Sequence, residues 1–435
     1  MFICGFSSME ITSYKPGEPN PALERIRSRS LQMNPELVAR VAAIVDAVRA
    51  EGDAALLRFT KEFDNVTLAP NQLRVDPDFI TDAGSRTDSV ALEAFSLAIR
   101  NVRAFHEQQR ESGWQMTTED GAVVGQRILP VASAGLYVPG GRAAYPSTVL
   151  MNAVPAQVAG VPRLAIATPP GTLERTPVVA AVIRELGIKE VYRVGGAQAI
   201  AAFAFGTESI PRVDKIVGPG NIYVAIAKKL VYGSVGIDSI AGPTEVVIIA
   251  DDSANPRFVA ADLLAQSEHD PEASSILITT TAELAREVSH EVERQIATID
   301  RRQIARASID SYGAAFVVGS LDAACELANL IAPEHLELMT SDDERAAELI
   351  ENAGAIFFGE WSSEPVGDYL AGPNHVLPTL GTSRFSSALG VYDFVKRQSV
   401  IRYTREALEK NADTIATMAD AEGLTAHRRA VLIRK

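Results

Sequence analysis

The segment from residue 164 to residue 251 contains four short apolar runs: LAIAT at 164–168, EVYRV at 190–194, KIV at 215–217 and EVVIIAD at 245–251. Segments of helical length separate these runs, and this alternation predicts βαβ units with a parallel sheet. The same rhythm continues with SILITT at 275–280, AAFVVG at 314–319 and AIFF at 355–358. The sequence therefore predicts an α/β protein with two wound domains.

Helices are expected on either side of this alternating region. Asn34-Pro35 supplies an N-cap followed by proline at the first helical position, and apolar residues then recur on one helical face, at positions 37, 38, 41, 44, 45 and 48. Gly52-Asp53 interrupts that helix, and another is expected from Ser89 to Phe105. After residue 390, FVKRQSVIRYT and a charged helical run predict a small appended module.

Bulk composition limits the class of protein. The 435 residues are 47% hydrophobic and 22% charged, which suits two or three ordinary globular domains. The net charge of 41 − 55 = −14 disfavours nucleic acids and anionic membranes as partners, so a small molecule fits better. The two cysteines, Cys4 and Cys325, are far apart and lack metal-binding spacing, which is typical of a reducing compartment. The opening MFICGFSSMEITS lacks the parts of a signal peptide, so a soluble cytoplasmic protein is expected.

Several polar residues in the alternating region could bind a metal ion. Gln266 and His269 lie three residues apart at the end of an apolar run, so on a helix they would share one face. Asp368 follows the turn-prone Pro365-Val366-Gly367, and His427 closes AEGLTAH. A nitrogen and oxygen set of this kind suits zinc better than calcium or magnesium. The alternative is that His269 is a helix-end residue bonded to Glu268 or to the backbone.

Two further histidines stand in polar loops. Glu334-His335 places a carboxylate beside an imidazole, and the two side chains could act on different protons because neighbours on a strand point to opposite sides. His375 lies in AGPNHVLP, where glycine and proline shape a loop that can present the imidazole to a ligand. Both segments also have the composition of ordinary structural turns.

Three glycine-rich loops resemble phosphate-binding turns: YVPGGRAAYPS at 137–147, VGGAQA at 194–199 and VGPGN at 217–221. Backbone N–H groups in such loops can receive a phosphate at a helix N-terminus. The dinucleotide fingerprint Gly-x-Gly-x-x-Gly is absent from the second and third loops, and glycine also simply closes many βα turns.

The chain resembles the histidinol dehydrogenase family in four segments: AQSEHD at 265–270, APEHLE at 332–337, VGDYLAGPNH at 366–375 and AEGLTAH at 421–427. The similarity extends from about residue 30 to the C-terminus. It implies one zinc ion per subunit, with ligands Gln266, His269, Asp368 and His427. It further implies a homodimer in which His427 completes the active site of the partner subunit.

The resemblance implies the last steps of histidine biosynthesis, in which L-histidinol is oxidised through L-histidinaldehyde to L-histidine in two NAD-dependent steps. Zinc would orient the substrate, His335 would be the general base and Glu334 would activate water. The implied substrate contacts are Thr244, Gln266, His269, His335, Asp368, His375, Glu422 and His427. The implied NAD contacts are Tyr137, Gln198 and Asn221. Thr244 stands where the family often has serine, and it retains the hydroxyl.

The architecture that the resemblance implies is a pair of incomplete Rossmann-like domains with mostly parallel sheets. The expected boundaries are a helical N-terminal module at 1–31, a larger domain of 32–136 with 245–389, an NAD-binding domain at 137–244, and a C-terminal module at 390–435.

Three other classes of protein are alternatives to this function. A dehydrogenase of the same fold could act on another alcohol, such as a sulfonated propanediol, but Glu422 would repel a sulfonate. An aldehyde dehydrogenase needs a nucleophilic cysteine, whereas Cys325 lies at helical core spacing and Cys4 lies in the tail. A structural zinc protein or an inactive relative would not need an intact set of acid, base and ligand residues.

Overall fold

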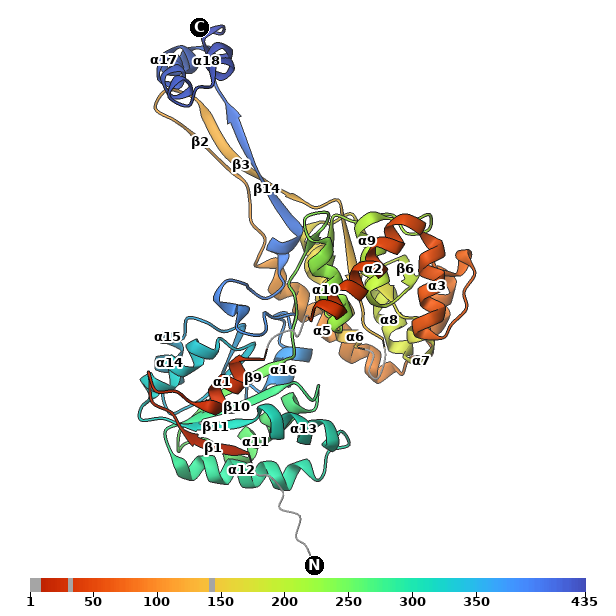
Figure 1. Cartoon of the computed structure of the whole chain (residues 1–435), viewed down its shortest axis with the longest axis vertical. Helices are drawn as coiled ribbons and strands as arrows, with labels where there is room; N and C mark the ends of the chain where they lie inside the picture. The colour runs from red at the N-terminus through yellow and green to blue at the C-terminus, as the bar shows by residue number, and fades with distance from the viewer. Residues whose placement is uncertain (1–8, 30–33, 141–144) are drawn as a thin grey trace, which may run out of the picture.

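The structure is a computed structural model that describes residues 9–29, 34–140 and 145–435. Two wound α/β domains lie next to each other, and a long antiparallel arm projects from them (Figure 1). The opening tail up to residue 8, with Cys4, lies outside the described residues. Within the described part, no helix is both long enough and apolar enough to cross a membrane.

The first wound domain is built on a five-stranded parallel sheet. Its order is β6-β5-β4-β7-β8, which is 3-2-1-4-5 when the strands are counted along the chain within the domain. This is the order of a dinucleotide-binding fold that lacks its sixth strand. The strands are β4 (Ser133–Tyr137), β5 (Arg163–Thr168), β6 (Glu190–Arg193), β7 (Lys215–Val217) and β8 (Gly236–Ile237). The expected incomplete Rossmann-like sheet is confirmed.

Helices cover both faces of this sheet. Those that follow its strands are α6 (Pro146–Ala159), α7 (Thr172–Arg175), α8 (Pro177–Glu185), α9 (Gly196–Phe205) and α10 (Ile222–Val231). The N-terminal helices are α2 (Pro35–Glu51), α3 (Asp53–Asp64), α4 (Pro77–Ser85) and α5 (Ser89–Glu107). The helix expected after Asn34 is confirmed, because the Asn34 side chain accepts from the N–H of Leu37 at 2.7 Å.

The N-terminal helices belong with the five-stranded sheet, and this differs from the expected grouping of 32–136 with 245–389. Helix α2 contacts α9 and α10, while α4 and α5 contact α8 and α6. Val41 and Val48 of α2 share one core with Ile200 of α9. Helical periodicity identifies an apolar face but carries no information about which sheet that face will cover.

The second wound domain has a six-stranded parallel sheet in the order β1-β11-β10-β9-β12-β13. The strands are β1 (Glu10–Ser13), β9 (Glu245–Ala250), β10 (Ser274–Thr279), β11 (Ala314–Val317), β12 (His335–Met339) and β13 (Ala355–Phe358). The helices are α11 (Pro256–Ser267), α12 (Ala282–Ile296), α13 (Arg302–Tyr312), α14 (Leu321–Ile331), α15 (Asp343–Glu348) and α16 (Glu364–Tyr369). Leaving out β1, the order along the chain is again 3-2-1-4-5.

The N-terminal segment joins this second sheet and is not a separate helical module. Strand β1 adds to the sheet edge, with Glu10 opposite Ala314 of β11, and helix α1 (Pro21–Arg27) follows it. The strand was missed because EITS is only four residues long and mostly exposed, so it lacks the apolar pattern that marks a buried strand.

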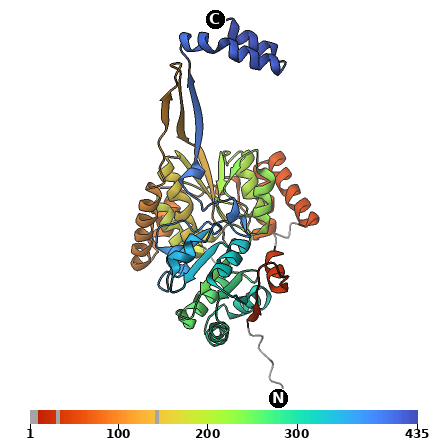
Figure 2. The ribbon, with the colours of Figure 1, turned by 90° about the vertical axis from the view of Figure 1, so that its left-hand side faces the viewer.

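The arm is an antiparallel sheet in the order β14-β3-β2, with two helices at its end (Figures 1 and 2). Its elements are β2 (Trp114–Thr117), β3 (Val123–Pro130), β14 (Val395–Arg402), α17 (Arg405–Ala421) and α18 (Thr425–Leu432). Strand β14 pairs with β3 along its whole length, from Val395 opposite Pro130 to Arg402 opposite Val123. Residues 114–130 therefore belong to the same arm as the expected C-terminal module. Short 3-10 turns lie at Pro70–Gln72, Thr382–Arg384 and Val391–Phe394.

Candidate active site

A cavity of about 340 Å³ is lined by residues of both wound domains. The five-stranded domain contributes loops that follow β4 and β7, including Pro139 and Asn221. These neighbouring strands mark the point where the strand order reverses, and ligands bind at the carboxyl ends of strands there. The six-stranded domain contributes Thr244 and Glu334, which precede β9 and β12. The carboxyl edge of one sheet thus faces the amino edge of the other.

Glu334 is held at the start of β12 by a tight connection. Ala332 ends α14 with a φ of 56°, and Pro333 then leads into Glu334, which is buried. Its Oε2 accepts from the Thr244 hydroxyl and from the N–H of Glu245, the latter at 3.1 Å. Burial raises the pKa of Glu334 to about 8, although the hydrogen bond from Thr244 acts in the opposite direction. The ionised carboxylate is therefore a stronger base than an ordinary glutamate.

His335 is oriented as a neutral base. Its Nδ1 lies 3.2 Å from the carbonyl oxygen of Glu245, and because a carbonyl only accepts, Nδ1 carries the proton. Nε2 then has a free lone pair, and it has no hydrogen-bond partner among the described residues. Burial lowers the pKa of His335 to about 3, with the N–H···O contact to Glu245 acting the other way. Nε2 lies 3.8 Å from Oδ1 of Asp368.

The predicted metal ligands Gln266, His269 and Asp368 meet beside His335. Gln266 is in the last turn of α11, but the helix ends at Ser267, so His269 lies in the following turn rather than on the same helix face. Asp368 is on helix α16, which includes the residues expected to form a turn. Pro365 is tolerated there because it occupies the first helical turn.

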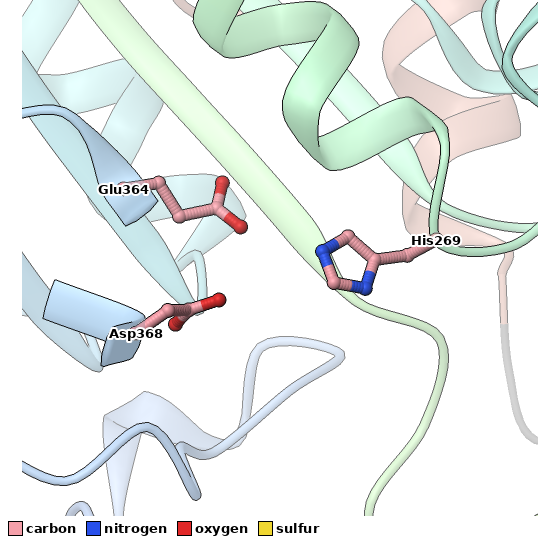
Figure 3. Close-up of side chains that lie close together, drawn as sticks. All are labelled: His269, Glu364 and Asp368. Atoms are coloured by element: carbon pink, nitrogen blue, oxygen red, sulfur yellow. The ribbon is translucent and has the colours of Figure 1, made fainter. Parts of the chain in front are cut away.

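Glu364 is a member of this cluster that the sequence analysis missed. It lies one helical turn before Asp368 on α16, and the two carboxylates face His269 (Figure 3). Ligand atoms of His269, Glu364 and Asp368 all lie within 4.8 Å of one another. Zinc ligands sit about 2.0–2.2 Å from the ion, so small side-chain rotations would bring these atoms to one ion. The i, i+4 spacing of Glu364 and Asp368 was the available signal.

The electrostatics of the cluster also fit a cation. Burial raises the pKa of Glu364 well above its usual range and that of Asp368 to about 7. Buried carboxylates are costly unless protons or a metal ion compensate their charge. A divalent ion held by nitrogen and oxygen atoms would neutralise this group, so the residues present fit zinc.

The Gln266 amide lies between this cluster and Thr244, which holds Glu334. One end lies 2.5 Å from Oγ1 of Thr244, and the other faces the Glu364 carboxylate. With its nitrogen toward Glu364, the amide donates to Oε2 at 2.7 Å, and its oxygen accepts from the N–H of Glu245 at 2.8 Å. With its oxygen toward Glu364, two acceptors would face each other, an arrangement that a cation between them would stabilise.

His375 lines the same cavity from the loop after α16. Its Nδ1 lies 3.2 Å from the carbonyl oxygen of Asp368, so Nδ1 donates and Nε2 is left as an acceptor. Burial lowers the pKa of His375 to about 4. The neutral imidazole can therefore accept a hydrogen bond from a ligand.

The predicted cofactor residues belong to the five-stranded domain, with Tyr137 at the end of β4, Gln198 in the first turn of α9 and Asn221 before α10. Asn221 lines the cavity and caps α10, accepting from the N–H of Tyr223 at 3.1 Å. Tyr137 and Gln198 are buried outside the described cavity lining, and the Tyr137 hydroxyl accepts from the N–H of Gly196 at 3.0 Å. Residues 141–144 of the first glycine-rich loop lie outside the described part of the chain.

A buried ion pair supports the third glycine-rich loop, at 217–221. Lys228 pairs with Asp238, and both side chains are almost fully buried. Lys228 Nζ donates to the carbonyl oxygen of Gly218 at 3.1 Å, while Asp238 accepts from the N–H of Gly218 at 2.8 Å. Both backbone groups of Gly218, which has a φ of 117°, are thereby anchored beside Asn221.

Glu422 and His427 are not brought to this cavity within the chain. Glu422 caps the end of α17, His427 lies in α18, and both are exposed on the helices at the end of the arm. Figure 1 shows these helices well apart from the two wound domains. The described chain thus brings together Gln266, His269, Asp368, Glu334 and His335, but not the two C-terminal residues.

Comparisons with a family model, with related sequences and with a solved structure point to the same family. The family model described as histidinol dehydrogenase matches residues 27–435. Histidinol dehydrogenase from Geobacillus kaustophilus is 51% identical over 421 residues, which cover 95% of this chain and 98% of that one. The enzyme from Synechococcus sp. is 54% identical, with coverage of 91% and 92%.

A solved structure supports the same relationship. The crystal structure of histidinol dehydrogenase from Elizabethkingia anophelis superposes with a TM-score of 0.91 at 36% identity and covers 98% of each chain. The chain is therefore an oxidoreductase that belongs to the histidinol dehydrogenase family.

Proposed function

We propose that this protein oxidises L-histidinol to L-histidine in two NAD-dependent steps through L-histidinaldehyde. The observation that carries the proposal is the position of His335 Nε2, a free acceptor within 3.8 Å of Asp368, in a cavity that both wound domains line. Membership of the family supports the substrate, and the acidic surroundings suit an amino alcohol that carries a positive charge.

The protein's residues divide the proton transfers between them. Nε2 of His335 takes the hydroxyl proton as the carbinol carbon loses hydride, which yields the aldehyde. Glu334 then takes a proton from water as the water oxygen adds to the aldehyde carbon, and protonated His335 returns its proton to the aldehyde oxygen, which gives the hydrate and neutral His335. His335 removes a hydroxyl proton from the resulting hydrate as the second hydride leaves. One water is consumed, and its oxygen becomes the second carboxylate oxygen of the product.

The cofactor residues complete this scheme. Zinc would be held by Gln266, His269, Asp368 and His427 of the partner subunit, and when bound it would orient the substrate. Tyr137, Gln198 and Asn221 would contact NAD, the acceptor of hydride in each step. Thr244 and His375 would contact the substrate, together with Glu422 of the partner subunit.

A homodimer with shared active sites is part of the proposal. The arm carries large exposed apolar side chains, including Trp114, Met116, Ile401, Met418 and Ile433, the last of which is 83% exposed. Exposed apolar groups concentrated on one projecting element are typical of a surface that another subunit covers. Packing of the arm on a second copy would carry Glu422 and His427 to the partner's cavity.

The competing function is oxidation of a different alcohol, such as a sulfonated propanediol. The buried Glu334 and Glu364 and the half-buried Asp368 make the cavity acidic, which favours an ammonium group over an anionic sulfonate. We therefore favour the amino alcohol.

The test of the function is product stoichiometry. Purified protein with NAD and L-histidinol should form two NADH per L-histidine, measured by NADH absorbance and amino-acid analysis. The sulfonated propanediol, assayed in parallel, should give no turnover above background. Turnover of the diol with none of histidinol would replace the proposal with the competing function.

Glu364→Gln is expected to weaken zinc binding by about 10–100-fold, because the variant loses one negative charge beside Gln266 and Asp368. Competition with a chromogenic chelator would measure the affinity. Glu360→Gln, made a few residues earlier in the half-buried turn before α16, is the matched control and should bind zinc like the wild type. Equal affinities for wild type and Glu364→Gln would exclude Glu364 from the metal centre.

A further inference from the structure

Arg29, near the end of the N-terminal segment, makes a buried ion pair behind the active site. Its guanidinium pairs with the carboxylate of Glu245, and the two side chains are only 3% and 4% exposed. Nη1 also donates to the carbonyl oxygen of Glu272 at 2.7 Å and lies 3.4 Å from that of Thr244. The guanidinium carbon is 5.6 Å from the centre of the Tyr312 ring. Arg29 is thus fixed from several directions.

The residues that Arg29 contacts are those that hold the catalytic pair. The N–H of Glu245 donates to Glu334 Oε2 at 3.1 Å, and the carbonyl oxygen of Glu245 accepts from His335 Nδ1 at 3.2 Å. The Thr244 hydroxyl donates to the same oxygen of Glu334. One peptide segment, residues 244–245, therefore sets both the position of the Glu334 carboxylate and the tautomer of His335.

We propose that Arg29 is a positioning residue for the acid/base pair, acting through residues 244–245. This inference rests on the proposed function and adds the N-terminal segment to the active site. Arg29 contacts this segment through the side chain of Glu245 and the carbonyl of Thr244. The proposed catalytic residues contact it through the backbone of Glu245 and the Thr244 hydroxyl. Arg29 itself is not part of the described cavity lining.

Arginine suits this position because its planar guanidinium offers donors in several fixed directions. Lysine could replace the charge but could not reach the carboxylate and the carbonyls in the same geometry. Removing the cation would leave the buried carboxylate of Glu245 without its ionic partner, and the start of β9 would be expected to shift. A shift of a few tenths of an ångström there would misalign both catalytic side chains.

The experiment compares Arg29→Ala with Arg25→Ala. Arg25 lies in the same segment, where it pairs with Glu10 at 2.7 Å, and it also donates to the carbonyl of Ser311 at 2.9 Å, but these contacts are exposed and distant in sequence from residues 244–245. We expect Arg29→Ala to lower kcat for L-histidinol by about 10–100-fold, with KM for NAD unchanged. Arg25→Ala should remain close to wild type. Added guanidinium chloride at low concentration should restore part of the lost kcat in Arg29→Ala alone.

A double variant separates positioning from folding. Arg29→Met with Glu245→Gln removes both buried charges, so it should recover the thermal stability that Arg29→Ala loses, while kcat stays low. Recovery of kcat together with stability, or no rescue by guanidinium, would overturn the inference. The two proposals fail separately, because an inactive wild type would contradict the function, whereas an active wild type with a fully active Arg29→Ala would contradict only the role of Arg29.

Discussion

His335→Asn is expected to lower kcat for L-histidinol by about 10²–10⁴-fold, the usual contribution of a general base. Asparagine can still donate to the carbonyl oxygen of Glu245, so the start of β12 should keep its position. The variant has no basic nitrogen in place of Nε2, which has no hydrogen-bond partner among the described residues. Both oxidation steps need this base, so both should be slow.

Steady-state kinetics would check this, with L-histidinol and L-histidinaldehyde as separate substrates. KM for NAD and zinc content should stay close to those of the wild type. His290→Asn, on the exposed face of α12, is the matched control and should be fully active. A kcat within a few-fold of wild type for His335→Asn would remove His335 from the proton-transfer scheme.

Two inactive variants, His335→Asn and His427→Asn, are expected to restore activity when they share one dimer. In a mixed dimer, the cavity of the His427→Asn subunit keeps its own His335 and receives the intact His427 of its partner. The cavity of the His335→Asn subunit lacks both histidines. Random pairing of equal amounts should therefore give about one quarter of the wild-type activity per active site.

Co-expression with two different affinity tags would isolate the mixed dimers, whose activity is compared with that of each variant alone. A pair with no restored activity would mean that His427 acts within its own chain. The control pair is His335→Asn with Glu334→Gln, whose altered residues lie on the same β12 connection and belong to one cavity. That mixed dimer should stay inactive, because each cavity then carries one defective residue of its own.

Buried elements were the part of the fold that local pattern could predict. Strands such as β7 and β9 are covered by helices on both faces, so nearly every side chain is apolar and the strand stands out in the sequence. Helix α2 was also predictable from the sequence, because its N-cap and its periodic apolar residues both indicate a helix at the same position. Strand β1 and the arm strands β2 and β14 carry mostly exposed residues, and the partners of β1 and β14 are also distant along the chain.

The residues of the candidate site divide in the same way, into those that a sequence motif indicates and those that only tertiary contacts place. The segments around Gln266, Glu334 and Asp368 allowed a metal site and an acid/base pair to be predicted, but only their resemblance to a known family indicated the roles of the individual residues. Glu364 and Arg29 stood in no motif, and only their positions beside Gln266 and Glu245 give them a role. The grouping of the N-terminal helices was also wrong for this reason, because an apolar face does not specify its partner.

For this protein, the sequence by itself determined the α/β class and the strand and helix rhythm, because these depend on local periodicity, and its family motifs supplied the prediction of the reactive side chains. The tertiary structure alone decided that the carboxyl edge of one sheet faces the amino edge of the other, and that residues 244–245 link Arg29 to His335. It also decided that Glu422 and His427 lie at the end of an arm. These features arise from contacts between residues far apart in the chain, and such contacts leave no periodic signal in the sequence.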